Sequence, residues 1–295
     1  MSAATVPDLP DEPTGRPAAV FTLLSEYASA LDNVRAGGRT VGFVPTMGAL
    51  HAGHQALVAR AASECDVVAV SIFVNPLQFG PGEDLSRYPR AVEEDLALCQ
   101  ALGVEAVFTP SPEEFYPPGF ATRVVPEGCA LPLEGERRPG HFSGVATVLV
   151  RLFGMLQPAR AYFGEKDFQQ LQVVRQLVRD LNLPVTVVGC PIVRDQGGLA
   201  LSSRNRYLSP EQRERARVLY QALQAAQQAF SAGERLASAL RARMLEVLTI
   251  PEAQVDYAVV VDTELREVPQ ATRGTHLLVA ATLFGIRLID HLELL

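Results

Sequence analysis

Apolar runs alternate with helical periodicity along the first two thirds of the chain. Runs typical of buried parallel strands occur at Val41–Val44, Asp66–Val74, Val104–Phe108, Arg160–Phe163 and Pro184–Cys190. Apolar residues recur at helical spacing within Phe21–Arg35, His54–Ser63, Tyr88–Leu102, Gly144–Leu156 and Asp167–Leu181. This alternation predicts an α/β fold with a mostly parallel, doubly wound sheet and right-handed crossovers.

The pattern changes after Ser209-Pro210. Glu211–Thr249 is mostly helical in composition with a break at Gly233, and three strand-like runs follow at Val255–Val261, His276–Leu283 and Ile286–Leu292. Helices followed by strands predict a smaller α+β domain. We therefore expect a first domain over residues 18–191 and a second over residues 192–295. Residues 1–17, rich in proline, are expected to be a disordered or loosely attached tail.

Composition narrows the functional class. Of 295 residues, 48% are hydrophobic and 20% are charged, which is typical of a soluble globular protein. The net charge of −7 argues against a general nucleic-acid surface. No run approaches the length of a membrane span, and Cys65, Cys99, Cys129 and Cys190 form no CxxC. We expect a cytoplasmic protein with reduced thiols and neither a membrane nor a nucleic-acid partner.

The stretch Thr40–Ser63 carries the first chemical signal. A buried strand leads through a glycine-bearing turn into His51-Ala52-Gly53-His54 and a helix. The free N–H groups and positive dipole of a helix start bind phosphate, and Gly48 and Gly53 allow the backbone to approach an anion closely. His51 and His54, three residues apart, are expected on one face, where they would donate to phosphate oxygens.

Two other interpretations of this histidine pair stay open. A metal pair would need a third ligand, and the usual helical zinc pair is HExxH. The alternative is a pair of ordinary surface histidines.

Two further loops, Asn75–Gln78 and Gly164–Gln170, leave strands at what should be the same sheet edge, and Leu201–Asn205 is a fourth loop that we group with them. Lys166 and Arg204 would neutralise phosphates, while the amides of Gln78 and Gln170 suit an organic carboxylate or hydroxyl. The chain contains no GxxxxGK[ST], GxGxxG or GxSxG pattern. A nucleotide site would therefore be of the HxGH type.

The segments PTMGALHAGH, SIFVNPLQFG, GEKDFQQL and LSSRNRYL resemble the signatures of the pantothenate synthetase (pantoate–beta-alanine ligase) family, and LEGERRPGHFSGV resembles a further family segment. The resemblance runs from about Val20 to the C-terminus. HxGH alone would indicate only the wider nucleotidyltransferase superfamily, whose core is Rossmann-like.

The resemblance implies a two-step reaction. Pantoate attacks the α-phosphorus of ATP to give pantoyl adenylate and pyrophosphate, and beta-alanine then displaces AMP to give pantothenate. It also implies Mg²⁺ carried on the ATP phosphates, no protein-held metal, and a homodimer.

The resemblance also implies site residues. The catalytic groups would be His54, His51, Lys166 and Arg204, with His54 in the place of a proton donor. ATP would be bound by Met47, Gly48, Ala49, Leu50, His51, Ala52, Gly53, His54, Gly164, Glu165, Lys166, Asp167, Val193, Leu201, Ser202, Ser203 and Arg204. The substrates would be bound by Gln78, Gln170 and Asn75, and the site would be bordered by Tyr88, Glu134 and Arg138.

The chain departs from the family pattern at two positions. Leu201 stands where methionine is usual, a change that nearly conserves volume and should have a mild effect. Phe168 replaces a common tyrosine and lacks its hydroxyl.

Two rival functions remain. Another HxGH nucleotidylyltransferase would bind a phosphorylated acceptor. We would then expect Lys and Arg at the acceptor site, where this chain has the amides of Gln78 and Gln170. A non-catalytic nucleotide sensor would not need His51, His54, Lys166 and Arg204 intact.

Overall fold

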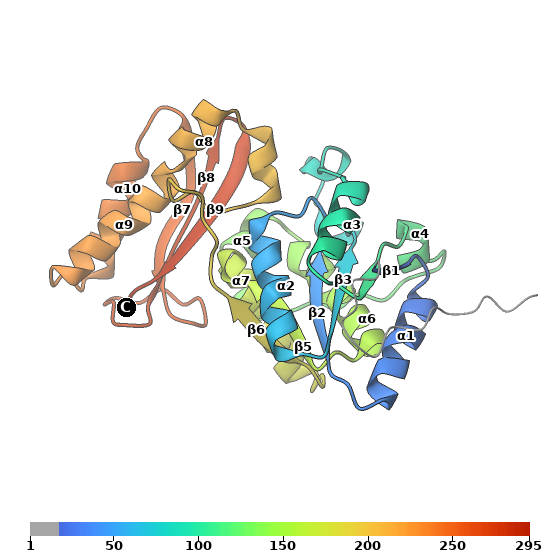
Figure 1. Ribbon diagram of the computed structural model, residues 1–295. Helices are drawn as coiled ribbons and strands as arrows, with labels where there is room; N and C mark the ends of the chain where they lie inside the picture. The colour runs from blue at the N-terminus through green and yellow to red at the C-terminus, as the bar shows by residue number, and fades with distance from the viewer. Residues whose placement is uncertain (1–17) are drawn as a thin grey trace, which may run out of the picture.

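The computed structural model describes residues 18–295 and contains two sheets (Figure 1). The larger sheet has six strands in the order β1-β4-β3-β2-β5-β6, and every neighbouring pair is parallel. The smaller is a three-stranded antiparallel sheet, β7-β8-β9. The predicted fold class, a doubly wound α/β sheet followed by a smaller α+β part, is confirmed.

The parallel sheet and its helices lie within residues 19–190. Its strands are β1 (Ala19–Phe21), β2 (Val41–Thr46), β3 (Val67–Ile72), β4 (Ala106–Phe108), β5 (Arg160–Gly164) and β6 (Thr186–Cys190). The longer helices are α1 (Leu24–Ala36), α2 (Ala52–Glu64), α3 (Val92–Ala101), α6 (His141–Leu156) and α7 (Phe168–Asp180). The short helices are η1 (Pro76–Gln78), η2 (Asp84–Ser86), α4 (Pro112–Phe115), η3 (Gly128–Ala130), α5 (Glu134–Arg137) and η4 (Glu165–Asp167).

Helices cover both faces of this sheet. Leu31 of α1 and Leu152 of α6 share a core with Phe43 of β2 on one face. Leu57 of α2 and Cys99 of α3 share a core with Val44, the next residue of β2, on the other face. Because successive strand residues point to opposite faces, a strand covered on both faces must be apolar throughout, and this explains the uninterrupted apolar runs.

The structure corrects three boundaries. Phe21, predicted as the start of a helix, ends the edge strand β1, whose three residues pair with β4. The third helix begins at Val92 instead of Tyr88, because Pro89 disfavours helical backbone at the residue before it. The strongly apolar helix begins at His141 instead of Gly144. The long predicted loop before it contains three short helices, α4, η3 and α5.

The C-terminal part packs helices on one face of its sheet. After η5 (Ser203–Tyr207) come α8 (Pro210–Ala216), α9 (Val218–Ser231), α10 (Ala237–Leu248), β7 (Ala253–Val261), β8 (His276–Leu283) and β9 (Ile286–Glu293). Leu223 of α9, Leu240 of α10 and Leu277 of β8 lie in one buried core. The predicted break at Gly233 is confirmed, since the residue has φ +105° between α9 and α10.

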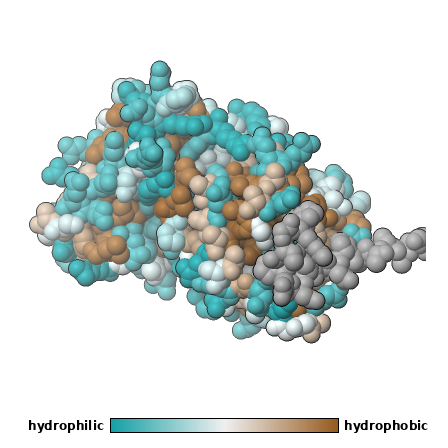
Figure 2. All heavy atoms as spheres, in the orientation of Figure 1, coloured by the Kyte–Doolittle hydropathy of each residue, from teal (hydrophilic) through white to brown (hydrophobic). Residues whose placement is uncertain are grey.

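On the face drawn in Figure 2, hydrophilic residues cover most of the outer rim, and apolar residues gather toward the middle. No helix within residues 18–295 is both long and apolar enough to cross a membrane. The predicted tail, residues 1–17, lies outside the described residues, and the division into domains at residues 191 and 192 stays a prediction.

Candidate active site

Two adjoining cavities of about 230 and 350 Å³ lie where the parallel strands end and the C-terminal sheet begins. Both are lined by Arg138, His141, Lys166, Gln170 and Arg204, so the two cavities share these side chains as a common wall. Most predicted site residues line the smaller cavity: Met47, His51, Gly53, His54, Asn75, Gln78, Tyr88, Arg138, Gly164, Lys166, Asp167, Gln170, Val193, Leu201, Ser202, Ser203 and Arg204. Glu134 lines the larger one, and Gly48, Ala49, Leu50, Ala52 and Glu165 line neither.

His51 and His54 form the start of α2 and face each other. His51 is the N-cap, and its Nδ1 accepts from the backbone N–H of Gly53 (3.1 Å). The Nδ1 of His54 accepts from the backbone N–H of His51 (3.3 Å), and the ring centroids are 4.2 Å apart. Gly53 is required here because a Cβ would lie 2.8 Å from the His51 ring. The expected proximity is found, with His51 just outside the helix.

These contacts fix the chemical state of both rings. Because each Nδ1 accepts a hydrogen bond, the proton of each neutral imidazole must be on Nε2. Burial, followed by the charge of Lys166, lowers the pKa of His51 to about 4. Burial, followed by His51, lowers the pKa of His54 to about 3. Near neutral pH both residues are therefore uncharged Nε2–H donors.

The glycine turn is held by a carboxylate from a neighbouring helix. The backbone N–H groups of Ala49 and Leu50 donate to the two carboxylate oxygens of Asp95 at 2.8 and 2.7 Å. Gly48 and Ala49 both have positive φ, +84° and +50°, and this aims the amides at one point. A carboxylate from α3 therefore holds the Ala49 and Leu50 amides, and the turn in this form places Met47 and His51 at the cavity.

Gln78 is held with its amide N–H₂ toward the cavity. Its Oε1 accepts from the side-chain amide of Asn75 (3.0 Å), and its Nε2 lies 3.1 Å from the sulfur of Met47. Asn75 is buried and fully bonded, because its Oδ1 also accepts from Tyr116 and its Nδ2 also donates to Gly144. Asn75 thus positions Gln78, which is the group able to bind a carboxylate or hydroxyl.

Gln170 and Lys166 come from the segment that follows β5. Gln170 lines both cavities, and its side-chain amide has no hydrogen-bond partner among residues 18–295. The Lys166 Nζ lies 3.6 Å from the Asp167 carboxylate, and its side chain is 18% exposed. Lys166 is thus a sheltered cation that faces the same space as the two histidines.

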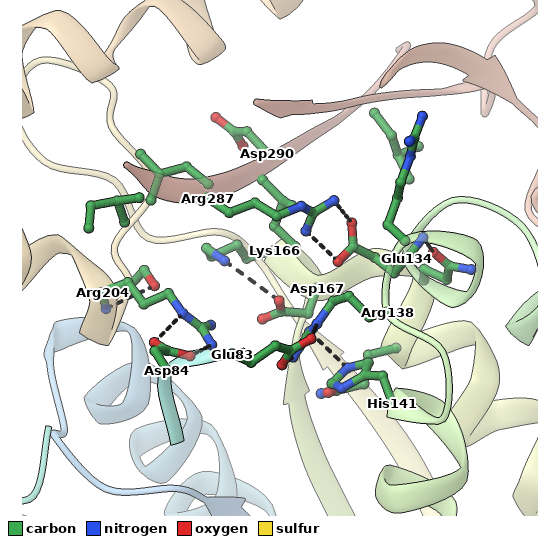
Figure 3. A pocket seen from close by; sticks show the side chains of 18 of the residues that line it. Glu83, Asp84, Glu134, Arg138, His141, Lys166, Asp167, Arg204, Arg287 and Asp290 are labelled. Carbon is green, nitrogen blue, oxygen red and sulfur yellow. Dashed lines mark hydrogen bonds and ion pairs between the residues drawn. The ribbon is translucent and has the colours of Figure 1, made fainter. Parts of the chain in front are cut away.

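The loop that carries Ser202 and Ser203 is tied to the glycine turn. The Ser203 hydroxyl donates to the Ala49 carbonyl (3.1 Å). Arg204 makes a bidentate ion pair with Asp84 at 2.8 and 2.9 Å, which Figure 3 shows beside Lys166. Burial alone would raise the pKa of Asp84, but the hydrogen bonds and charge of Arg204 lower it.

A second arginine at the cavity is held in the same way. Arg138 pairs through Nε and Nη2 with Glu83 at 2.9 and 2.8 Å, and its Nη1 lies 3.2 Å from the Nε2 of His141 (Figure 3). Glu83 and Asp84 are adjacent, so one short segment orients two arginines.

The C-terminal sheet closes the far side of the larger cavity. Arg287 of β9 pairs with both Glu134 oxygens at 2.7 Å and with Asp256 at 2.6 Å, and Tyr257 donates to Glu134 at 2.8 Å. Although burial opposes it, the Arg287 hydrogen bonds keep the pKa of Glu134 below its usual value.

Sequence reasoning missed Glu83, Asp84, Asp95 and His141. Glu83 and Asp84 lie in GPGEDLSRYPR and His141 in RRPGH, segments whose charges and prolines resemble ordinary loops. Asp95 belongs to an acidic first helical turn and carried no signal of its contact with residues 46 positions earlier.

Known proteins of one family are similar to this chain in sequence. A family model described as pantoate-beta-alanine ligase matches residues 19–293. Among curated relatives, the pantothenate synthetase of Deinococcus radiodurans is 56% identical over 262 residues, 86% of this chain and 93% of that protein. That of Thermus thermophilus is 57% identical over 255 residues, 86% of this chain and 92% of that protein.

Solved structures of the same family are similar to this chain in fold. A crystal structure of pantothenate synthetase from Thermus thermophilus has a TM-score of 0.89 and 51% identity, covering 93% of this chain and 99% of that one. Pantoate-beta-alanine ligase from Francisella tularensis, complexed with beta-gamma ATP and beta-alanine, has a TM-score of 0.79 and 34% identity, covering 94% and 97%.

Proposed function

The chain belongs to the pantoate-beta-alanine ligase family, and we propose that its site joins pantoate to beta-alanine through a pantoyl adenylate. ATP supplies the adenylyl group, and pyrophosphate and then AMP leave. One observation carries the proposal: two neutral histidines, a lysine, an arginine and two glutamine amides line one cavity at the strand ends.

The first step needs stabilisation of charge on the departing pyrophosphate. The Nε2–H groups of His51 and His54 donate to phosphate oxygens without requiring a proton from solvent, and Lys166 and Arg204 supply positive charge. Arg204 has Nε and Nη2 bonded to Asp84, which leaves its Nη1 for phosphate. Because both histidines are neutral, we assign them electrostatic stabilisation of the phosphates, and not donation of a full proton from an imidazolium.

The second requirement is to hold a small carboxylate beside the α-phosphorus. Gln78 presents Nε2, and Gln170 offers an unpaired amide, within a cavity whose wall includes Val145 and Leu149. An apolar wall with two amides suits an uncharged carbon chain that carries hydroxyl and carboxylate groups. Positioning of this kind raises the effective concentration of the reacting carboxylate.

Magnesium fits this site as an ion carried by ATP. No group of three or more metal-binding side chains occurs within the described part of the chain, and Glu83 and Asp84 are engaged by arginines. Mg²⁺ would be held by phosphates and water, beside a cavity that the Asp167 carboxylate lines, and would neutralise phosphate charge.

We also propose that the enzyme is a cytoplasmic homodimer with domains over residues 18–191 and 192–295, and that it binds no nucleic acid. Four unpaired cysteines support the cytoplasmic location, and a net charge of −7 supports the absence of nucleic-acid binding. Analytical ultracentrifugation tests the oligomeric state.

The test separates the two steps. Mixing enzyme with ATP, Mg²⁺ and pantoate, without beta-alanine, should release pyrophosphate in a burst near one per active site and leave bound pantoyl adenylate. Adding beta-alanine should then release AMP and pantothenate. His54→Ala should slow the first step far more than the second.

Two outcomes would contradict the mechanism. ADP and inorganic phosphate would indicate an acyl-phosphate route. Pyrophosphate release that strictly requires beta-alanine would rule out a separable adenylate.

A further inference from the structure

His141 connects two parts of the site that no sequence signal joined. It begins α6, is 6% exposed, and lines both cavities. Its Nδ1 lies 2.9 Å from the backbone carbonyl of Gln78, and its Nε2 lies 3.2 Å from Nη1 of Arg138.

The chemistry of these partners fixes the ring. A guanidinium can only donate, so the Nε2 of His141 must accept. A carbonyl can only accept, so Nδ1 must carry the proton. This is the opposite tautomer to the one assigned to His51 and His54 in the same site.

The same partners keep the ring neutral. Protonation of Nε2 would break the bond from Arg138 and place two cations in contact. Burial, followed by the Arg138 charge, accordingly lowers the pKa of His141 to about 4.

The backbone around His141 leaves little room for adjustment. A Cβ on Gly144 would lie 2.2 Å from the Leu77 carbonyl oxygen, so the first turn of α6 packs directly against η1. The Gln78 side chain is anchored separately by Asn75, and Arg138 is anchored on its other edge by Glu83. His141 is the only link among the described residues that bonds to both Gln78 and Arg138.

We propose that His141 is a positioning residue for the ligase reaction: as an Nδ1–H imidazole it holds the Gln78 backbone and the Arg138 guanidinium in one arrangement. Its effect on substrate binding rests on the proposed function, because that function assigns pantoate to Gln78. Loss of a buried hydrogen bond typically changes binding by about tenfold.

Two substitutions separate the two contacts. In His141→Asn the side-chain N–H₂ lies near the former Nδ1 and can still donate to Gln78. In His141→Gln the amide oxygen reaches the former Nε2 position and can still accept from Arg138. We expect the KM for pantoate to stay within about threefold in H141N and to rise about tenfold in H141Q.

Thr147→Val is the matched control. Thr147 is buried on the same helix, where its hydroxyl accepts from Val124 N–H (3.0 Å) and donates to Ser143 (2.7 Å), and it lines neither cavity. T147V should leave the KM for pantoate unchanged. An equal rise in T147V and H141Q would overturn the proposal, since general loosening of α6 would explain both.

A second measurement is independent of turnover. Two-bond ¹H–¹⁵N correlation spectra of the native enzyme at pH 7 should show an Nδ1–H histidine signal that disappears in H141N. This signal is separate from that of the His276–His291 pair, in which Nδ1 of His276 lies 2.9 Å from Nε2 of His291 and either nitrogen can carry the shared proton. An Nε2–H tautomer at His141 would overturn the proposal, even if the variants fail to fold. If the native enzyme makes no pantothenate, the proposed function fails while the tautomer result still stands.

Discussion

At the scale of single residues, the site depends on neutral imidazoles. An imidazolium next to Lys166 would be repelled, and burial opposes its charge further. The Nε2–H of a neutral ring still donates to phosphate, and its proton is not lost when pH rises through 7. The donor strength of His51 and His54 should therefore be nearly constant over the physiological pH range.

A titration of the free enzyme tests this directly. The Cε1–H resonances of His51 and His54, assigned by single substitutions to Gln, should not shift between pH 8 and pH 6. Their midpoints should lie near 4 and 3. The urea-unfolded chain is the control and should titrate near 6.5. A midpoint above 6 for either residue in the folded enzyme would contradict the assignment.

Lys166 is the cation whose loss should cost most. It is sheltered and lines both cavities, and its only ion pair within residues 18–295 is the 3.6 Å contact with Asp167. Lys166→Ala should raise the barrier to adenylation by roughly 3 kcal/mol or more, which is on the order of 100-fold in the rate of the pyrophosphate burst.

The control for Lys166→Ala is Arg243→Ala, which makes the same change in net charge on the exposed side of α10. It should leave the burst rate unchanged. A near-normal burst in the Lys166 variant would remove Lys166 from the chemistry.

At the scale of elements, α3 sets the shape of the glycine turn. Asp95 is 2% exposed and accepts two backbone hydrogen bonds. One comes from Ala49, which has a left-handed backbone, and the other from the next residue, Leu50. Burial, against the effect of those two hydrogen bonds, raises the pKa of Asp95. A fixed acceptor at this point holds Met47 and His51 at the entrance of α2.

Asp95→Asn should therefore loosen the turn. An amide group replaces one acceptor with a donor that faces a backbone N–H, so one buried hydrogen bond is lost and a second is weakened. We expect the ATP KM to rise about tenfold. The neighbouring Glu94→Gln, whose side chain is 75% exposed, is the matched control and should behave like the native enzyme. Unchanged hydrogen exchange at the Ala49 and Leu50 amides in Asp95→Asn would contradict this role.

Sequence reasoning was strongest where signals are local. The valine-rich strands, the glycine turn and the motif residues at strand ends follow from periodicity and short spacing, and the structure brings those motifs to one space. Asp95 and His141 were missed because each acts across more than 40 residues of sequence. β1 was missed because three residues are too few to show the period of a strand, and they form one only by pairing with β4.

At the scale of the whole molecule, the site lies between two sheets joined by buried ionic contacts. Arg287 reaches from β9 to Glu134 of α5, and Arg194, which follows β6, reaches Asp290 at 2.6 Å. Removal of one partner from such a pair leaves a buried charge without compensation, so these contacts fix where the C-terminal sheet sits over the cavity. Lys166, from the segment after β5, and Arg287, from β9, consequently both line the larger cavity (Figure 3).

The five histidines share one property that couples the site to global stability. Burial is the largest cause of a lowered pKa in each of them. The values are about 4 for His51, His141 and His276 and about 3 for His54 and His291. In the unfolded chain they should titrate near 6.5. The unfolded state therefore binds more protons than the folded state between about pH 6.5 and pH 4.

The sign of the pH dependence follows from this difference. Stability is highest above pH 6.5, where both states are neutral at these residues, and falls as pH drops toward the folded pKa values. The raised pKa values of Asp95, Glu105, Glu165 and Asp290 act in the opposite direction. We expect the melting temperature to fall steadily from pH 7 to pH 5, with uptake of about four protons on unfolding at pH 5. Calorimetry in two buffers of different ionisation enthalpy measures that uptake. A melting temperature that is flat from pH 7 to pH 5, or uptake below about one proton, would show that the histidines are not held neutral by the fold.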